Sequence, residues 1–320
     1  MEHFDVLTIG ETLVDAIAAE KGKSLAQTQR FDRHLGGSVA NIACAVALMG
    51  GRAGIISQVG EDDAGRMCRN QLRQAGVDVS ALHLTPTLAT THAYVSRTEG
   101  TPEFRIERGA DASLRLNAQD AQCIAQTRII HASTFALSVE PLRSAVIEAL
   151  TLGYYAGKIV SLDPNYHPHV WPNIQEARSV LARLYPLVAI TKPSLDDATR
   201  LFGTGRSNME YMQCFLDMGA KLVVLTTGPD DVYIADQQGY RAHVPVPRVP
   251  VTDVTGAGDW FWAAFMLAHL DGFPPVQAVR FAIAVAHYKI GFVGPLLAPI
   301  DRKKLYETLC FTPPNQNIAH

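Results

Sequence analysis

The feature that most constrains the fold is the regular alternation of short apolar runs with longer amphipathic segments. Apolar runs of this length, separated by helix-length segments, are typical of buried parallel strands joined by crossover helices. The expected strands are 6–10, 53–59, 129–133, 159–162, 188–191 and 222–226. The expected helices are 38–49, 64–75, 140–155, 174–184, 195–202, 209–218 and 275–290. This order predicts an α/β fold with a mainly parallel central sheet.

Two stretches, residues 11–35 and 88–108, interrupt the alternation with strand-like pieces that have no helix between them. In the second stretch, runs at 91–97 and 103–108 flank the sequence TEGTP, which is typical of a hairpin turn. A further hairpin is expected around DQQG, within 232–244. We therefore expect one domain over residues 1–320, with a small β-sheet lid built from 11–35 and 88–108.

Charge and composition exclude several classes of protein. The 320 residues carry a formal net charge of −3, which gives no electrostatic footprint for nucleic acid or an anionic membrane surface. The apolar runs are too short to span a bilayer, and the start, MEHFDVLTIG, lacks a secretory pattern. Five scattered cysteines fit a reducing compartment. We expect a cytoplasmic protein with no nucleic-acid or membrane partner.

The segment TDVTGAGDWF, at 252–261, is the strongest candidate for chemistry. A glycine-rich turn that leads into an apolar helix offers free backbone amides and the positive end of the helix dipole, which suits a phosphoryl group. Asp259 then lies in the first turn, where a carboxylate would repel a phosphate unless it takes a proton from an attacking hydroxyl. On this segment alone, Asp259 could equally be an acidic residue that favours the helix dipole.

Several motifs together resemble the ribokinase/fructokinase-type (pfkB) carbohydrate kinase family. DVTGAGDWF is similar to its C-terminal signature, and LGGSVANIACAVALMG at 35–50 and VGEDDAG at 59–65 are similar to its N-terminal elements. DPN at 163–165, KPSLDDATRLFG at 192–203 and TTG at 226–228 follow in the family's order. The resemblance covers essentially the whole chain. It implies a ribokinase-like three-layer α/β/α fold.

The resemblance also implies roles for individual residues in phosphoryl transfer. Asp259 would be the catalytic base, and the amides around Gly256, Ala257 and Gly258 would form the anion hole. ATP would lie along the C-terminal half of the chain. The nucleotide-binding residues would be Lys192, Thr226, Gly228 and Ala286.

Sugar contacts in this family come from the end of the first strand, the GG turn and the lid. The substrate-binding candidates are Asp15, Gly36, Gly37, Asn41, Tyr94, Arg108 and Asn165. Without the resemblance, Gly36-Gly37 would be read as a strand-to-helix turn. Arg108 could instead be a solvated charge on the lid hairpin.

Metal binding is the part of the family pattern that is most altered here. The resemblance implies Mg²⁺ held mainly by phosphates and reached by Asp197 through water, and K⁺ bound by the loop of Asp253 and Thr255. The family's NxxE element is Ser194-x-x-Asp197 in this chain, and Ser194 also fits a helix N-cap. His167 stands where some members carry an arginine, which makes an acidic sugar less favoured.

These features predict an ATP-dependent sugar kinase, fructokinase-like first and 2-keto-3-deoxygluconate-kinase-like second. The alternatives are a nucleoside kinase of the same family and a catalytically weak sugar-binding sensor on a kinase scaffold. A Rossmann dehydrogenase is disfavoured because TIGETLVD, rather than GxGxxG, follows the first strand. The exposed edges of the lid strands further predict a homodimer formed through the lid.

Overall fold

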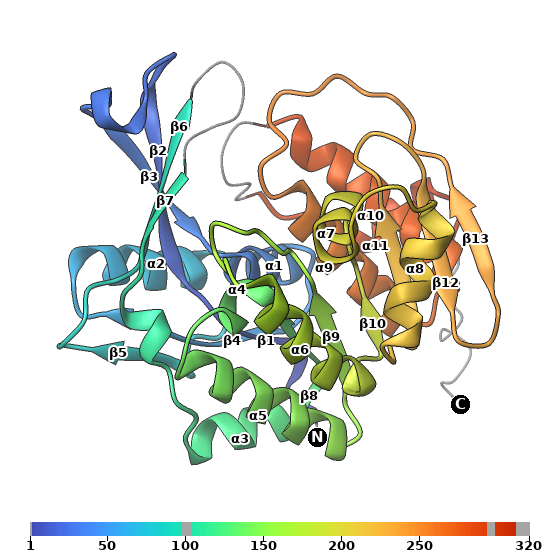
Figure 1. The fold of residues 1–320 in the computed structure, drawn as a ribbon, viewed down its shortest axis with the longest axis horizontal. Coiled ribbons are helices and arrows are strands. Elements are labelled where there is room, and N and C mark those ends of the chain that lie inside the picture. The colour runs from blue at the N-terminus through green and yellow to red at the C-terminus, as the bar shows by residue number, and fades with distance from the viewer. Residues whose placement is uncertain (1, 98–103, 293–297, 312–320) are drawn as a thin grey trace.

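The central sheet runs through the middle of the molecule and is mainly parallel (Figure 1). The structure is a computed structural model that describes residues 2–97, 104–292 and 298–311. The nine strands lie in the order β13 (Arg241–Val244), β12 (Val232–Asp236), β11 (Leu222–Thr226), β10 (Ile190–Thr191), β9 (Ile159–Asp163), β8 (Thr127–Ser133), β1 (Phe4–Ile9), β4 (Ala53–Gly60) and β5 (Leu82–Thr85). Among the described residues, the antiparallel pairings of this sheet are β11 with β12 and β12 with β13, and the second of these is the hairpin expected within 232–244.

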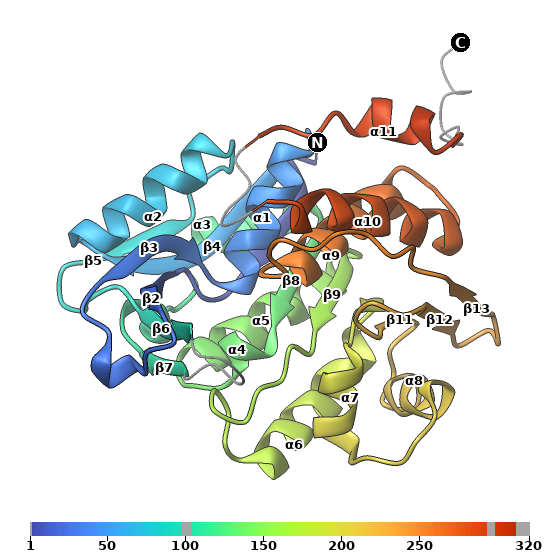
Figure 2. The same ribbon diagram turned by 90° about the horizontal axis from the view of Figure 1, so that it is seen from above.

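Helices cover both faces of this sheet and give the three layers that the sequence predicts (Figure 2). One face carries α1 (Ser38–Leu48), α2 (Asp63–Gln74), α9 (Ala257–Leu270) and α10 (Pro275–Ile290), with α11 (Arg302–Thr308) outside α10. The other face carries α3 (Ala118–Ala125), α4 (Thr134–Leu137), α5 (Leu142–Tyr155), α6 (Ile174–Leu184), α7 (Leu195–Phe202) and α8 (Asn208–Asp217). Short 3₁₀ helices occur at Leu25–Gln27, Ala110–Ser113 and Tyr185–Leu187.

The two cores follow from the alternation of side chains along each strand. Val6 and Ile55 point into the core beneath α1 and α9, whereas Leu7 and Ile56 point into the core on the opposite face. Because both faces are covered, the central strands are mostly apolar on both faces rather than alternately polar. In α1 the buried side chains are mainly small, which allows close packing against α9.

A separate four-stranded sheet rises above the carboxyl end of the central strands, as the lid expectation requires (Figure 1). Its order is β3 (Phe31–Gly36), β2 (Leu13–Lys21), β6 (His92–Arg97) and β7 (Phe104–Glu107). The strands lie within the predicted stretches 11–35 and 88–108, except that β3 ends at Gly36. The expected TEGTP turn lies outside the described residues.

Several details differ from the sequence-based expectations. The strand expected at 188–191 is reduced to β10, and the helix expected at 140–155 begins two residues later, at Leu142. The sequence pattern missed β5 and α3, which are only four and eight residues long, and the short helices α4 and α11. The expected strand at 103–108 is confirmed for Phe104–Glu107.

Candidate active site

The candidate residues gather where the parallel strands end at their carboxyl edge. Asp163 is the last residue of β9, Lys192 follows β10 directly, and Thr226 ends β11. In parallel α/β sheets this edge is where ligands bind, because crossover connections leave a crevice there. The lid strands rise from the same edge, so the site lies between the lid and the central sheet.

The glycine-rich turn forms the N-terminus of α9. Gly256 is the N-cap residue and takes a left-handed conformation, with φ of 73°, which a glycine adopts without steric cost. Gly256 offers no side chain that could cap the helix. The amide of Ala257 donates to the carbonyl of Val254 at 3.1 Å within the turn. The next amides, at Gly258 and Asp259, head the helix and are suited to an anion.

Asp259 lies in the first turn of α9 and receives two hydrogen bonds from α1. Ser38 Oγ donates to Asp259 Oδ1 at 2.7 Å, and Asn41 Nδ2 donates to Oδ2 at 2.9 Å. Loss of solvent raises the pKa of Asp259, while the bonds from Asn41 and Ser38 act to lower it. The result is a fixed carboxylate that accepts a proton more readily than a solvated aspartate does.

Lys192 brings a buried positive charge to the same turn. Its ammonium lies 3.0 Å from Asp163 Oδ2, and both side chains are almost fully buried. Burial opposes the charge, but attraction to Asp163 and Asp197 outweighs burial and raises the pKa of Lys192. A Cβ added at Gly258 would lie 3.6 Å from Lys192 Nζ, so the ammonium borders the start of α9.

Asp15 faces the same space from the lid strand β2. Burial and the negative charge of Asp259 raise the pKa of Asp15 to about 6. A Cβ added at Gly36 would lie 2.4 Å from the carboxyl carbon of Asp15, so any larger residue would displace this carboxylate. Gly37 has φ of 100°, and a Cβ there would meet the backbone oxygen of Glu11 at 2.6 Å. Gly37 is therefore required by packing as well as by the turn, and Gly36 leaves room for the carboxylate of Asp15.

The three remaining substrate candidates are Tyr94 and Arg108, at the lid, and Asn165, just after β9. Tyr94 packs edge-on against Phe31 and lies 4.8 Å beneath the guanidinium of Arg105. Asn165 is exposed, with φ of 34°, and its amide donates to Asp163 Oδ1 at 3.2 Å.

The alternative that Arg108 is a solvated hairpin charge is wrong. Its side chain is 19% exposed, and its Nε lies 2.9 Å from Asp111 Oδ2. The guanidinium also lies 4.2 Å above the ring of Phe135. Arg108 therefore belongs to the base of the lid, and a contact with sugar stays a prediction.

The nucleotide-binding candidates lie on the C-terminal half of the sheet. The amide of Thr226 donates to the carbonyl of Pro193 at 3.0 Å, which joins the end of β11 to the segment after Lys192. Gly228 has φ of 73° in the following turn, and Ala286 packs against the core from α10.

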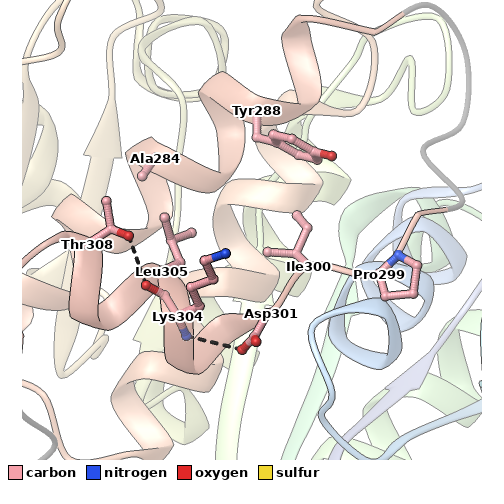
Figure 3. Close-up of a pocket in the computed structure, with 8 residues that line it drawn as sticks. All are labelled: Ala284, Tyr288, Pro299, Ile300, Asp301, Lys304, Leu305 and Thr308. Atoms are coloured by element: carbon pink, nitrogen blue, oxygen red, sulfur yellow. Dashed lines mark hydrogen bonds between the residues drawn. The ribbon is translucent and has the colours of Figure 1, made fainter.

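The outer side of α10 holds a separate pocket of about 610 Å³ against α11 (Figure 3). Its lining residues are Ala284, Tyr288, Pro299, Ile300, Asp301, Lys304, Leu305 and Thr308. None of the candidate residues lines it, so it is distinct from the site.

The candidate metal-binding residues are held by protein contacts. Asp197 Oδ1 accepts from the amide of Tyr166 at 2.7 Å, and its Oδ2 accepts from both the amide and the hydroxyl of Ser194. Ser194 is confirmed as the N-cap of α7. Asp253 Oδ1 accepts from the amide of Thr255 at 2.9 Å. Within residues 2–97, 104–292 and 298–311, no cluster of three or more His, Cys, Asp or Glu could hold a metal ion.

Three residues of the site were missed as individual candidates. Ser38 bonds to Asp259, Asp163 pairs with Lys192, and Glu11 accepts from the amide of Ser38 at 2.8 Å. The position of Asp163 at the end of an apolar run could have indicated a site residue. No sequence pattern indicates Ser38 or Glu11, because their partners are set by tertiary contacts.

Comparisons with known proteins extend over nearly the whole chain. Residues 3–299 match the pfkB family carbohydrate kinases. The ATP-dependent 6-phosphofructokinase of Thermoanaerobacterium thermosaccharolyticum is 32% identical over 310 residues, which cover 96% of this chain and 95% of that protein.

Solved structures of similar proteins include two fructokinases. Halothermothrix orenii fructokinase has a TM-score of 0.76 at 32% identity, covering 88% of this chain and 98% of that one. Xylella fastidiosa fructokinase with bound ATP has a TM-score of 0.82 at 25% identity, covering 96% of this chain and 99% of that one. Across the described residues, no helix is long and apolar enough to cross a membrane.

Proposed function

The chain belongs to the pfkB family of carbohydrate kinases and is an ATP-dependent sugar kinase, and from this premise we propose that Asp259 is its catalytic base. In the proposed reaction, Asp259 takes the proton of a sugar hydroxyl as its oxygen attacks the γ-phosphorus of ATP. The bond from that phosphorus to the β,γ-bridging oxygen breaks, and ADP leaves. The observation that carries this proposal is the carboxylate held by Ser38 and Asn41 at the start of α9.

The charge on the transferring phosphoryl group needs positive partners in a site with little water. The amides that begin α9 and the ammonium of Lys192 meet at Gly258, which supports their shared role as the anion hole. Removal of one such donor typically costs about 10²- to 10³-fold in kcat. Thr226, Gly228 and Ala286 are proposed to border the nucleotide on the same side of the sheet.

For the acceptor, we propose a neutral ketohexose, with fructose as the leading candidate. Two carboxylates, Asp15 and Asp259, face the same space closely enough for one to raise the pKa of the other. Such a pair accepts hydrogen bonds from neutral hydroxyls and repels an anionic sugar. Two of the lid cations, Arg105 and Arg108, are already paired, with Glu107 and Asp111, which also favours a neutral substrate.

A panel of acceptors in a coupled ADP-release assay tests this proposal. We expect fructose to give the highest kcat/KM, above fructose 6-phosphate, 2-keto-3-deoxygluconate, adenosine and inosine. A preference for either anionic sugar would overturn the argument from Asp15 and Asp259. Activity on nucleosides alone would favour a nucleoside kinase, and sugar binding without ADP release at high enzyme concentration would favour a sensor.

For the metal, we propose Mg²⁺ bound mainly by the ATP phosphates, where it would bridge them and offset their charge. Both oxygens of Asp197 already accept hydrogen bonds, which supports contact through a water molecule.

K⁺ is proposed for the loop of Asp253 and Thr255. Turnover should stop with excess chelator, and replacing K⁺ by tetramethylammonium should lower kcat if the loop binds K⁺.

We further propose a cytoplasmic homodimer formed through the lid. The edge strands β3 and β7 leave backbone groups open for pairing with a second copy, and exposed edges of this kind favour association. All five cysteines are free thiols, in keeping with a reducing compartment. Light scattering at micromolar concentration should give twice the mass of the chain, and a monomer mass would count against the dimer.

A further inference from the structure

A group of buried polar side chains lies at the base of the lid, where all four lid strands join the central domain. Glu11 precedes β2, Ser38 follows β3, Thr91 precedes β6, and Arg108 follows β7, with Asp111 close by. Glu11, Thr91 and Asp111 are each 1% exposed or less. Burying charged and polar groups is costly unless they are paired, so their placement calls for a structural reason.

Part of this cluster ties the lid strands to one another. Arg108 Nε lies 2.9 Å from Asp111 Oδ2, and the hydroxyl of Thr91 donates to Asp111 Oδ1. The hydroxyl of Thr91 also accepts from the amide of Gly109 at 2.7 Å. These contacts join the start of β6 to the segment after β7, and they do not involve the first turn of α1.

Glu11 differs from the rest because it also bonds to α1. The N-cap residue of α1 is Gly37, which has no side chain to satisfy the amides of the first turn. Glu11 Oε1 fills that role from another segment and accepts from the amide of Ser38 at 2.8 Å. A Cβ at Gly37 would lie 2.6 Å from the carbonyl oxygen of Glu11, so the two segments are in close contact.

The first turn of α1, to which Glu11 is hydrogen-bonded, is also the turn that holds Asp259. Ser38 Oγ and Asn41 Nδ2 contact the two carboxylate oxygens, at 2.7 and 2.9 Å. The amide of Asn41 donates to the carbonyl of Gly37 at 2.9 Å, so both donors belong to the first turn of α1. A displacement of that turn would move both donors away from Asp259 together.

We propose that Glu11 is a positioning residue, which fixes the first turn of α1 through the Ser38 amide and thereby keeps Ser38 and Asn41 on Asp259. The inference rests on the proposed role of Asp259 as the base. Glu11 also faces Arg108, whose positive charge helps to offset the burial of the Glu11 carboxylate. The carboxylate of Glu11 therefore connects the foot of the lid with the first turn of α1, which holds Asp259.

The bond from Ser38 to Glu11 does not depend on the charge of Glu11. Burial raises the pKa of Glu11 to about 7, against the attraction of Arg108. A proton would be carried by Oε2, which has no hydrogen-bond partner among the described residues, and Oε1 would stay an acceptor. An uncharged glutamine should therefore replace Glu11 in this role, whereas alanine should not.

The test compares Glu11→Ala and Glu11→Gln in the full-length chain and in an Asp259→Asn background. Steady-state kinetics with fructose and ATP, thermal unfolding and ATP binding are measured for each. Small displacements of reacting groups cost up to about 10²-fold, so Glu11→Ala should lower kcat about 10- to 100-fold with the KM for ATP nearly unchanged. Glu11→Gln should stay within about threefold of the wild type, because it keeps the acceptor.

The Asp259→Asn background separates positioning from general destabilisation. Residues that act through one another are non-additive, so Glu11→Ala should lower the residual kcat of Asp259→Asn by less than about twofold. Asp111→Asn is the matched control, because it disturbs the same buried cluster without touching the α1 bond. Its kcat should stay within about threefold of the wild type, even if its melting temperature falls.

Three results would overturn the inference: equal losses for glutamine and alanine at position 11, additive losses in the Asp259→Asn background, or an Asp111→Asn loss as large as that of Glu11→Ala. If Glu11→Ala does not fold, the glutamine variant and the Asp111 control still decide, since wild-type-like kcat is required of both. Near-normal turnover of Asp259→Asn alone would instead overturn the proposed base, and the inference with it.

Discussion

The ion pair between Lys192 and Asp163 gives a prediction whose size can be worked out. Lys192→Met removes the ammonium and leaves Asp163, which is 2% exposed, without its charged partner. A buried unpaired charge costs about 3–5 kcal/mol, and the carboxylate can avoid this only by taking up a proton. Burial already raises the pKa of Asp163 to about 7 in the wild type, against the attraction of Lys192, so the destabilisation is limited to the part of the protonation cost that the wild type does not already carry.

The same reasoning fixes how the loss depends on pH. The folded variant keeps a proton on Asp163 that the wild type releases as pH rises through about 7, so stability relative to wild type falls above that pH. The loss should be below about 0.5 kcal/mol at pH 6, about 1.4 at pH 8 and about 2.7 at pH 9. Urea unfolding followed by circular dichroism at these three pH values measures it directly.

A double variant provides the control. Lys192→Met with Asp163→Asn buries no charge at either position, so most of the stability should return at pH 9. Its kcat should remain as low as that of Lys192→Met, because the ammonium beside Gly258 is still absent. A loss below about 1 kcal/mol at pH 9, or a loss that is independent of pH, would refute the buried pair as described.

Three further predictions concern Asp15, its neighbour Gly36 and the donor Ser38. Gly36→Ala should raise the KM for fructose and leave the KM for ATP unchanged, because the added Cβ would lie 2.4 Å from the carboxyl carbon of Asp15. Equal changes in both KM values would contradict this. The kcat/KM for fructose should fall as pH drops through about 6, where Asp15 gains a proton and loses acceptor capacity, and a flat profile down to pH 5 would count against it. Ser38→Ala should lower kcat about tenfold and shift the acid limb of the kcat–pH profile to higher pH. The reason is that the lost hydrogen bond acts to lower the pKa of Asp259. An acid limb at the wild-type pH would contradict a role for that bond.

Much of the fold could be predicted because the parallel strands are apolar on both faces and short. The helix expected at 275–290 matches α10, and the lid strands fall almost entirely within the two stretches that lack helices. The missed helix α3 has only a weak apolar stripe, although Asn117 and Asp120 form a capping box that could have indicated its start. The strand β5 is short and half-polar at the sheet edge, which leaves little pattern to detect.

The site was predictable where residues belong to local motifs and not where tertiary contacts define them. Asp259 and Asn41 come from motifs 218 positions apart and are hydrogen-bonded in the structure. Glu11 gains its contact with Ser38 only when β1 and α1 pack side by side. Arg108 was interpreted as a substrate contact or a hairpin charge because its partner, Asp111, lies in a 3₁₀ helix that the pattern did not predict.

The most direct test of the central claim is the kcat of Asp259→Asn with fructose and ATP. Asparagine can keep both neighbours, accepting from Asn41 and donating to Ser38, so the site should keep its shape while losing the base. Because a positioned base contributes about 10²- to 10⁴-fold, kcat should fall by at least about 100-fold with ATP affinity retained. A kcat within about threefold of the wild type, in a folded variant that binds ATP, would contradict the account.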